Sequence, residues 1–405
     1  MNATAGQLAD HRSYRLTSID MLRGLVIIIM ALDHTRDFFM AGATQDPMSD
    51  PNATVPLYFT RWITHFCAPV FVFLAGTSAG LMAARKTPAE LATFLITRGL
   101  WLVFIEVFVI STGISFAPFG DPNLGGKTFL MLQVIWAIGV GMILLGLLQF
   151  LGRKVCLALG VIIVLGHNAL DPVWPTLQAY PQGEAPLWIS FHTLLVKPIG
   201  PFFLVSSYPA LPWLGVILLG FGASSIFEKP AEQRQRSLIR WGLGITAGFL
   251  VLRALDVYGD PNHWETQASG TVRTALDFLN TTKYGPSLLF TMMTLGPAAI
   301  FCACAERWSG WLKDTLVMFG RVPFAFYIAH WYLMHTLCIL LALMQGFSAA
   351  SVMTVPGAGN FPEGFGVPLV GVYGVWLLVV VTLYPWVRFM AGVKSRSKSW
   401  WLSYL

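Results

Sequence analysis

Charged residues are scarce in this chain. Asp, Glu, Lys and Arg make up 11% of its 405 residues, whereas 55% are hydrophobic. A soluble domain has about 25% charged residues, so this deficit argues against an ordinary soluble fold. Long apolar runs recur along the chain, and the two features together predict an all-α polytopic membrane protein. The net charge of +6 is small, and because its bases lie in short loops, we expect no nucleic-acid partner.

Several familiar motifs are also missing. There is no GxxxxGK[ST] loop, no GxGxxG at a strand-to-helix turn and no HExxH, which argues against a P-loop, a dinucleotide-binding domain and a zincin. His330 and His335 are five residues apart, about 140° around a helix, so they form no one-face metal pair and we predict no metal. The five cysteines all lie in or beside apolar runs. An odd number of buried thiols indicates packing rather than a disulfide framework.

Ten apolar segments are typical of transmembrane helices. They cover 19–39, 57–83, 92–113, 128–150, 155–170, 211–227, 241–257, 285–304, 315–345 and 368–391. The run 315–345 is long enough to tilt or to project from the membrane. Segment 187–207 is apolar but interrupted by prolines, which predicts a re-entrant or interfacial piece. The first run starts near Ile19 without a signal-peptide pattern, so we expect it to be retained.

Basic residues alternate between the loops. The loops after even-numbered spans contain most of the loop lysines and arginines, and both ends of the chain are basic. The loops after odd-numbered spans are longer and poor in bases. The positive-inside rule then places both termini in the cytoplasm, in agreement with an even number of spans. We expect one membrane domain over 1–405, with cytoplasmic tails at 1–18 and 392–405.

The first span carries three ionisable residues on one face. Residues 19–34 read IDMLRGLVIIIMALDH. At about 100° per residue, Asp20, Arg23 and His34 fall within roughly 60° of one another. An ionisable group inside a bilayer costs about 2.5–3.5 kcal/mol even on the lenient insertion scales. We therefore expect this stripe to face a polar interior and to mark the functional site.

Arginines form an inner polar layer. Arg23, Arg98 and Arg321 each lie one or two turns inside the cytoplasmic end of spans that run outward. If those helices are neighbours, the three side chains form a cationic recess suited to bidentate phosphate binding. Snorkelling to the lipid headgroups is the alternative for each arginine. Asp20 has the alternative of a simple i, i+3 ion pair with Arg23.

A second polar layer lies nearer the outer face. Its members are Asp33, His34, His65, His167, Asn168, Arg253 and His330. Histidine is the side chain best able to exchange a proton near neutral pH. A single membrane histidine more often makes a packing hydrogen bond. We favour His34 as the reactive histidine and keep His65 and His330 as further candidates.

Six blocks of sequence stand out along the chain. They are RLTSIDMLRGLVIIIMALDH, TRWITHFCAPVFVFLAGTSAGL, LQVIWAIGVGMI, YPALPWLGVILLGFG, FLNTTKYGPSLLFTMMTLGP and GRVPFAFYIAHWYLMH. These blocks resemble the bacterial heparan-α-glucosaminide N-acetyltransferase-like membrane proteins. The resemblance extends over almost the whole chain. It implies a multi-pass acetyltransferase of the bacterial inner membrane that uses acetyl-CoA or another acyl-CoA, although heparan itself is not an expected bacterial acceptor.

The first block is also similar to the opening of the membrane acyltransferase-3 proteins, which O-acetylate surface polysaccharides. In that family an Asp, an Arg three residues on and a His eleven beyond it have the spacing of Asp20, Arg23 and His34. The Arg and the His are required there for acyl transfer, so the resemblance implies these roles for Arg23 and His34. Arg98, in TRGLW, matches a later arginine-rich motif of that family only weakly.

The chain departs from the lysosomal heparan acetyltransferase between spans 1 and 2. That enzyme has a His followed by Pro-Trp-Asn-Gly in this stretch, and its acetyl-transfer histidine lies there. Here the stretch reads DPMSDPNATVPLYFTRW, with no histidine before His65. Either His34 or His65 then takes that role.

These features predict transfer of an acyl group, most simply acetyl, from cytoplasmic acyl-CoA to a hydroxyl or amine at the outer side. The acceptor is a glycan or a small molecule of the cell envelope. Arg23 and His34 are 11 residues or about 16.5 Å apart along the helix, which matches a pantetheine arm of about 15–20 Å. His34 acts as general base, with Asp33 or another carboxylate biasing its tautomer. The candidates on the acceptor side are His330, His167, Asn168, Arg253 and Lys283. Arg253, Lys283 and His65 are also suited to stabilising an oxyanion or binding an anionic acceptor.

Two other functions fit parts of the pattern. A proton-coupled transporter or a lipid or glycan flippase also places Asp, Arg and His inside the membrane, but the two halves of the sequence contain no evident inverted repeat. A haem or quinone protein would use the histidines and leave the arginine layer unexplained. Membrane lipid is the expected surrounding, and a homodimer is compatible with the sequence.

Overall fold

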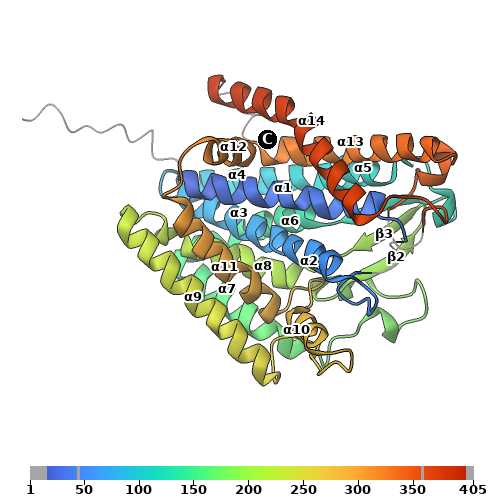
Figure 1. The fold of residues 1–405 in the computed structure, drawn as a ribbon. Coiled ribbons are helices and arrows are strands. Elements are labelled where there is room, and N and C mark those ends of the chain that lie inside the picture. The colour runs from blue at the N-terminus through green and yellow to red at the C-terminus, as the bar shows by residue number, and fades with distance from the viewer. Residues whose placement is uncertain (1–15, 43–45, 357–359, 398–405) are drawn as a thin grey trace, which may run out of the picture.

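Long helices dominate the fold (Figure 1). The computed structural model describes residues 16–42, 46–356 and 360–397. The helices are α1 (Thr17–Phe39), α2 (Val55–Thr64), α3 (Cys67–Ala83), α4 (Pro88–Ile105), α5 (Ser111–Ser115), α6 (Val134–Leu148), α7 (Arg153–Gly166), α8 (Ala210–Ala223), α9 (Ala231–Leu255), α10 (Thr271–Leu279), α11 (Leu288–Ala305), α12 (Trp311–Arg321), α13 (Pro323–Met344) and α14 (Leu369–Arg396). A π-helical turn at Glu106–Ile110 joins α4 to α5.

The fold is that of a polytopic membrane protein. Eight helical segments of the described chain are long and apolar enough to cross a membrane. Helix α1 packs against α12, and the shorter apolar segment Ala210–Ile226 packs against α3 and α7. The predicted all-α membrane architecture is therefore confirmed, with one small sheet added to it.

The sheet marks one end of the bundle. Strands β1 (Thr128–Leu132), β2 (Leu195–Ile199) and β3 (Phe202–Ser206) pair in the order β1-β3-β2, with β1 parallel and β2 antiparallel to β3. Helix α1 begins and α14 ends at the opposite side of the molecule (Figure 1). We name these two sides the sheet end and the terminal end.

Two predicted segments are wrong in part. The segment expected as a helix over 128–150 begins with strand β1, and α6 starts only at Val134. The segment 187–207, expected as a re-entrant or interfacial piece, contains a short 3₁₀ turn followed by the β2–β3 hairpin. An apolar run of five residues fits a strand as well as a helical turn, so the pattern alone did not separate them. The parallel β1–β3 pair brings Gln133 and Ser207 close together, and Ser207 N donates to Leu132 O at 3.3 Å.

The long run 315–345 is two helices rather than one. Helix α12 ends at Arg321, and Val322 has φ −134° and ψ 48°, outside the helical region. The next residue is Pro323, which begins α13. Proline disfavours the helical conformation of the residue before it and donates no backbone hydrogen bond. This break places Arg321 at a helix end instead of within a tilted helix.

Helices α1 and α12 approach unusually closely. A Cβ atom on Gly24 would lie 1.9 Å from Leu316 O, and one on Gly320 would lie 1.8 Å from the carbonyl oxygen of Asp20. Both distances are far below van der Waals contact, so only glycine fits at either position. Small residues allow membrane helices to pack backbone against backbone. The result is that the charged first turns of α1 lie directly beside the end of α12.

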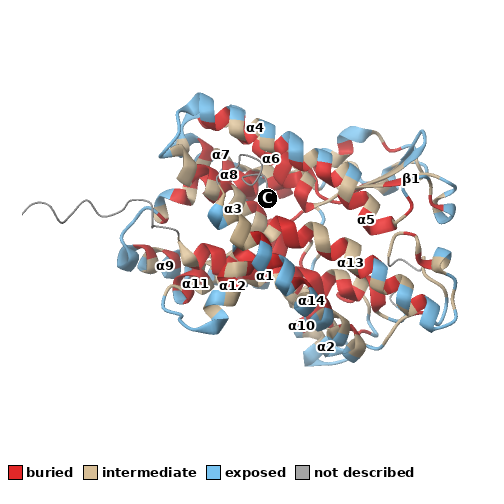
Figure 2. Ribbon diagram, turned by 90° about the horizontal axis from the view of Figure 1, so that it is seen from above, coloured by how far each residue is buried: buried red, intermediate tan, exposed pale blue. Residues whose placement is uncertain are grey.

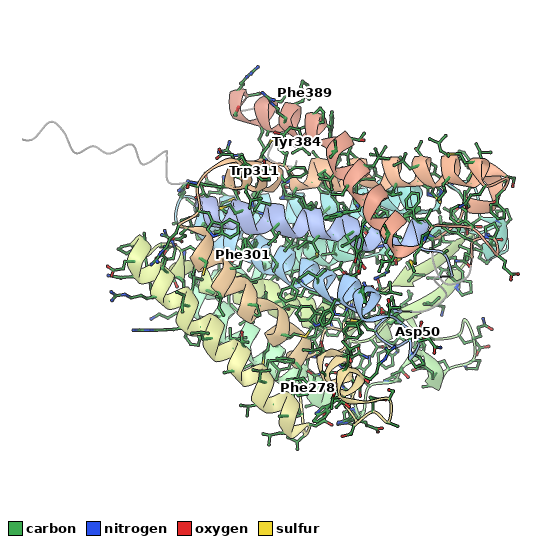
Figure 3. The ribbon with its side chains drawn as sticks, in the orientation of Figure 1. Asp50, Phe278, Phe301, Trp311, Tyr384 and Phe389 are labelled. Atoms are coloured by element: carbon green, nitrogen blue, oxygen red, sulfur yellow. The ribbon has the colours of Figure 1, made fainter. Side chains whose placement is uncertain are left out.

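The outer faces of the helices are apolar. Buried residues concentrate along the middle of the bundle, whereas exposed ones line the outward faces of helices such as α4 (Figure 2). Many exposed side chains are large and hydrophobic, including Phe104, Phe108 and Val381. Phe389 on α14 is exposed (Figure 3), whereas the ring of Tyr384 lies 6.3 Å from that of Phe319 on α12. Such a surface matches contact with lipid rather than with water.

Candidate active site

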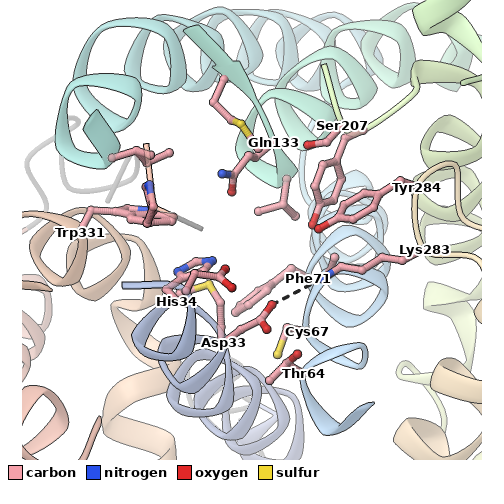
Figure 4. Close-up of a pocket in the computed structure, with 18 of the residues that line it drawn as sticks. Asp33, His34, Thr64, Cys67, Phe71, Gln133, Ser207, Lys283, Tyr284 and Trp331 are labelled. Atoms are coloured by element: carbon pink, nitrogen blue, oxygen red, sulfur yellow. Dashed lines mark ion pairs between the residues drawn. The ribbon is translucent and has the colours of Figure 1, made fainter. Parts of the chain in front are cut away.

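Two cavities lie inside the helix bundle. The first is near the sheet end, and we name it the histidine cavity (Figure 4). Its polar lining consists of Asp33, His34, Asp37, Thr64, Gln133, Ser207, Tyr208, Lys283 and Tyr284. The second is near the terminal end, and we name it the arginine cavity; Arg23, Arg98, Arg321 and Lys394 line it. They enclose about 790 and 1150 Å³ of empty space, openings included.

His34 is hydrogen-bonded to a second histidine. Its Nδ1 lies 2.7 Å from Nε2 of His330 on α13, and Nδ1 of His330 is bonded to the carbonyl oxygen of Tyr327. A carbonyl oxygen only accepts, so His330 Nδ1 carries the proton and its Nε2 accepts when the ring is neutral. His34 Nδ1 must then donate, which leaves Nε2 of His34 without a proton. His34 is only half-buried and lines the cavity, so this chain of bonds prepares it as a base.

Aromatic rings hold the two imidazoles in place. The His34 ring stacks on Trp331 with centroids 4.0 Å apart and planes at 24°. The His330 ring stacks on Phe326 at 5.6 Å with planes at 3°. These contacts limit rotation of both rings and preserve the hydrogen bond between them. The indole face also favours positive charge on a stacked imidazole, because an aromatic face attracts cations.

Asp33 belongs to a separate ionic network. Its carboxylate lies 2.6 Å from Arg61 Nη1, 3.0 Å from Arg36 Nη1 and 3.5 Å from Lys283 Nζ. We expected Asp33 or another carboxylate to bias the tautomer of His34, but Nδ1 of His34 is hydrogen-bonded to His330. Asp33 instead anchors three cations, one of which faces the cavity (Figure 4).

Arg61 ties this network to the loop after α1. Its guanidinium donates to both oxygens of Asp33 and both oxygens of Asp46. Burial on its own raises the pKa of the Asp46 carboxyl, but Arg61 outweighs burial and holds that pKa well below its usual range. The ion pairs therefore fix α2 against the end of α1, beside the cavity mouth.

Two tyrosines face the histidine cavity from loops. Tyr208 precedes α8 and Tyr284 precedes α11, and their rings lie 6.0 Å apart at 73°. Burial, and next the neighbouring Tyr284, raises the pKa of Tyr208 well above its usual value. A phenol that stays protonated is a hydrogen-bond donor. Tyr208, Ser207 and Lys283 therefore supply donors to a group bound in this cavity.

The structure brings the three predicted arginines together in the arginine cavity. Arg23 donates to Asp20 Oδ1 at 3.2 Å, to Ser78 Oγ at 3.2 Å and to the Gly320 carbonyl at 3.4 Å. The i, i+3 pair with Asp20 is thus present and orients the arginine without removing it from the cavity. Arg321 is exposed and Arg98 is half-buried. Together these groups form a strongly cationic recess, suited to phosphates.

Ser78 in this cavity lies in a GTSAG run, which has the spacing of a serine nucleophile motif. The run is inside helix α3, however, and no strand-to-helix turn precedes it. Ser78 Oγ donates to Leu74 O at 2.7 Å and accepts from Arg23. The serine therefore positions the arginine.

Several predicted site residues lie outside the linings of both cavities. His65 is buried with its ring edge-on to Phe290 at 5.3 Å. Arg253 is fully buried and donates to four backbone carbonyls around the end of α10. Asn168 accepts from Leu288 N at the start of α11, and His167 packs edge-on to another histidine. These contacts are those of packing and helix-capping residues.

Other lining residues were missed by sequence reasoning. Lys394 lies in the basic C-terminal part of the chain, and nothing in the sequence shows that it reaches the arginine cavity. Gln133 lines the histidine cavity, and its backbone N donates to Glu106 Oε1 at 3.1 Å. Ser207 and Tyr208 follow strand β3, which was not predicted. Among the residues that the structure describes, no group of three or more His, Cys, Asp or Glu could hold a metal ion.

No curated protein matches the chain. A family model described as heparan-alpha-glucosaminide N-acetyltransferase, catalytic, matches residues 15–257. The match covers 243 of 405 residues, and it includes Arg23, His34, Arg98 and Gln133. This multi-pass membrane protein therefore belongs to the heparan-α-glucosaminide N-acetyltransferase catalytic family and has the fold of a membrane acetyltransferase.

Proposed function

We propose that this protein transfers an acyl group, in the first place acetyl, from acyl-CoA to a hydroxyl or amine acceptor. Acyl-CoA binds in the arginine cavity and the acceptor binds in the histidine cavity, where His34 is the general base. The observation that carries the proposal is the His34–His330 pair at the wall of a cavity adjoining a cationic recess. Membership of an acetyltransferase family supports the choice of acetyl.

The arginine cavity has the chemistry that a CoA donor requires. The phosphates of CoA are anionic, and arginine binds phosphate through two parallel hydrogen bonds. Arg23 and His34 lie on one helix, 11 residues or about 16.5 Å apart. An extended pantetheine arm of about 15–20 Å spans that distance. Phosphates held near Arg23 and Arg321 would therefore leave the thioester close to His34.

The reaction needs no covalent intermediate on the protein. His34 Nε2 takes the proton from the acceptor O–H or N–H while the oxygen or nitrogen attacks the thioester carbonyl. The tetrahedral intermediate then collapses, the C–S bond breaks, and the imidazolium returns its proton to the departing CoA sulfur. His330 accepts from His34 Nδ1 throughout and so orients the base, as the third member of a catalytic triad does. Tyr208 and Lys283 are placed to donate to the oxyanion.

The distribution of basic residues supports an orientation. Most of the lysines and arginines that lie in loops or at helix ends are at the terminal end, so the positive-inside rule favours the cytoplasm on that side. The arginine cavity then takes its donor from the cytoplasmic acyl-CoA pool, and the histidine cavity takes its acceptor from the outer face. A glycan or another envelope component of a bacterial inner membrane fits this geometry.

The test is acyl transfer by purified protein in detergent. Wild-type protein should bind CoA and slowly hydrolyse acetyl-CoA even without acceptor. His34→Ala should lose turnover by about 10²–10⁴-fold, the usual contribution of a general base, and keep its affinity for CoA. Turnover of His34→Ala at the wild-type rate would refute this role. Solute movement in proteoliposomes without an acyl donor would instead favour a carrier.

A further inference from the structure

The two cavities meet at three apolar side chains. Met30 on α1, Phe71 on α3 and Val134 on α6 each line both the histidine cavity and the arginine cavity. Met30 and Val134 are buried, and Phe71 is half-buried. We name these three residues the neck. Each comes from a different helix, so the neck closes the space between the cavities from three sides.

The neck lies between the proposed phosphate site and the proposed base. Met30 is seven residues or two turns beyond Arg23, and four residues or one turn before His34, on the same face of α1. Any ligand that reaches from Arg23 to His34 along this face must pass Met30. Ile27, Ile135 and Ile138 line the space below the neck. Above it, the apolar side chains of Ile114, Met131 and Trp331 line the histidine cavity together with its charged and hydroxyl groups.

We propose that the neck selects short acyl groups and separates the donor cavity from the acceptor cavity. This inference rests on the proposed acyl transfer and adds its chain-length specificity. The acyl group must cross the neck ahead of the thioester, so a longer chain must extend through the neck into the histidine cavity. A bulky chain would have to displace the Phe71 ring, which lines both cavities. Acetyl crosses without this penalty.

Phe71 is the residue to change, because its ring is the largest and least buried part of the neck. Phe71→Ala should raise the ratio of hexanoyl to acetyl turnover at least about tenfold, the discrimination that small changes in an apolar pocket produce. Phe71→Trp should lower turnover of both donors. The readout is the ratio of the two donors within each variant, because a change in CoA affinity that is common to both donors does not alter this ratio. The matched control is Phe104→Ala, which removes a ring that is 50% exposed on the outer face of α4.

A second measurement needs no acyl chemistry. Cys67 lines the histidine cavity, and the exposed Cys304 can be replaced by Ser to remove background. In membrane vesicles that expose the terminal end, a small charged methanethiosulfonate reaches Cys67 only through the neck. Phe71→Ala should speed this labelling by about tenfold or more, in line with the same pocket discrimination, and Phe104→Ala should not change it.

The outcomes separate the neck from the proposed function. Cys67 could be labelled faster in Phe71→Ala although the wild-type protein transfers no acyl group. This result would support the neck as a barrier and refute the proposed acyl transfer. Acetyl transfer by wild type with an unchanged donor ratio in Phe71→Ala would overturn the selection of chain length. Labelling that is equally fast in wild type and Phe71→Ala would overturn the barrier itself.

Discussion

His330 offers a sharp test of the proposed mechanism. It lines neither cavity and is fully buried, yet its hydrogen bond to His34 Nδ1 at 2.7 Å determines which nitrogen of a neutral His34 lacks a proton. Replacing His330 by Phe preserves a buried ring of similar size and removes the acceptor atom. Replacing it by Gln preserves an acceptor oxygen. If His330 serves only in packing, the Phe variant should retain more activity than the Gln variant. If His330 orients the base, the Gln variant should retain more activity.

The size of the effect follows from the bond that is lost. When His34 becomes an imidazolium, its Nδ1–H makes a charge-assisted hydrogen bond, worth about 1.5–3 kcal/mol. At 1.36 kcal/mol per factor of ten, its loss costs roughly 10- to 150-fold in turnover. Without an acceptor at Nδ1, the ring is also free to take the tautomer that carries the proton on Nε2, which is no base at all. We therefore expect His330→Phe to lower kcat by about 10²–10³-fold.

The assay is release of CoA thiol from acetyl-CoA, with CoA affinity measured by calorimetry on the same preparations. His330→Phe should lower kcat and leave the CoA dissociation constant unchanged, and His330→Gln should recover at least part of the rate. The control is His335→Gln on the same helix, since His335 is buried and its ring nitrogens are bonded to the backbone carbonyls of Ile114 and Val352. Wild-type turnover in His330→Phe, or equal losses in the control, would refute the reasoning.

Three further predictions address the donor site, the packing and the loop network. Arg321→Gln should weaken CoA binding about tenfold, as expected for one hydrogen bond between charged groups, and the difference should shrink as salt is added; calorimetry at two salt concentrations measures both. Gly320→Val should lower the Tm in detergent by several degrees, because its Cβ meets the Asp20 carbonyl, whereas Gly244→Val, with nothing within 4 Å, should not. Asp46→Asn should lower the Tm at pH 7. Arg61 depresses the pKa of Asp46 in the folded state. The ionised carboxyl therefore stabilises the folded protein above the unfolded pKa of about 3.9, and this stabilisation is lost as the pH falls below that value. The Tm values of wild type and Asp46→Asn should therefore converge in acid.

The first helix was the most predictable part of the site. A helix turns by a fixed angle per residue, so the spacing of Asp20, Arg23 and His34 determined their shared face before any neighbour was known. The alternation of loop charges predicted in which direction each span crosses the membrane. That direction predicted whether each residue lies nearer the inner or the outer face. Depth was enough to group Arg98 and Arg321 with Arg23, and the arginine cavity contains all three.

The sequence did not predict in the same way which helices pack side by side. Depth placed His330 in the layer of His34 but gave no reason to pair it with His34 rather than with His65. That choice depends on the packing of α13 against α1, which the break at Pro323 and the glycine contacts of α12 determine. The hydrophobic pattern of β1 was ambiguous for a related reason, since its partner β3 lies about 70 residues later in the chain.

The arrangement around His34 gives a physical reason for a histidine partner instead of a carboxylate. The neighbouring acids already have partners, because Asp33 contacts three cations, Asp37 contacts Arg36, and Asp46 contacts Arg61. A further buried carboxylate beside His34 would bring an unbalanced charge into the membrane interior, at a cost of several kcal/mol. A neutral imidazole that is itself bonded to a backbone carbonyl accepts the same hydrogen bond with no net charge. The paired acids and cations thus anchor α1 and α2. The proposed base, His34, stays uncharged until it takes a proton from the acceptor.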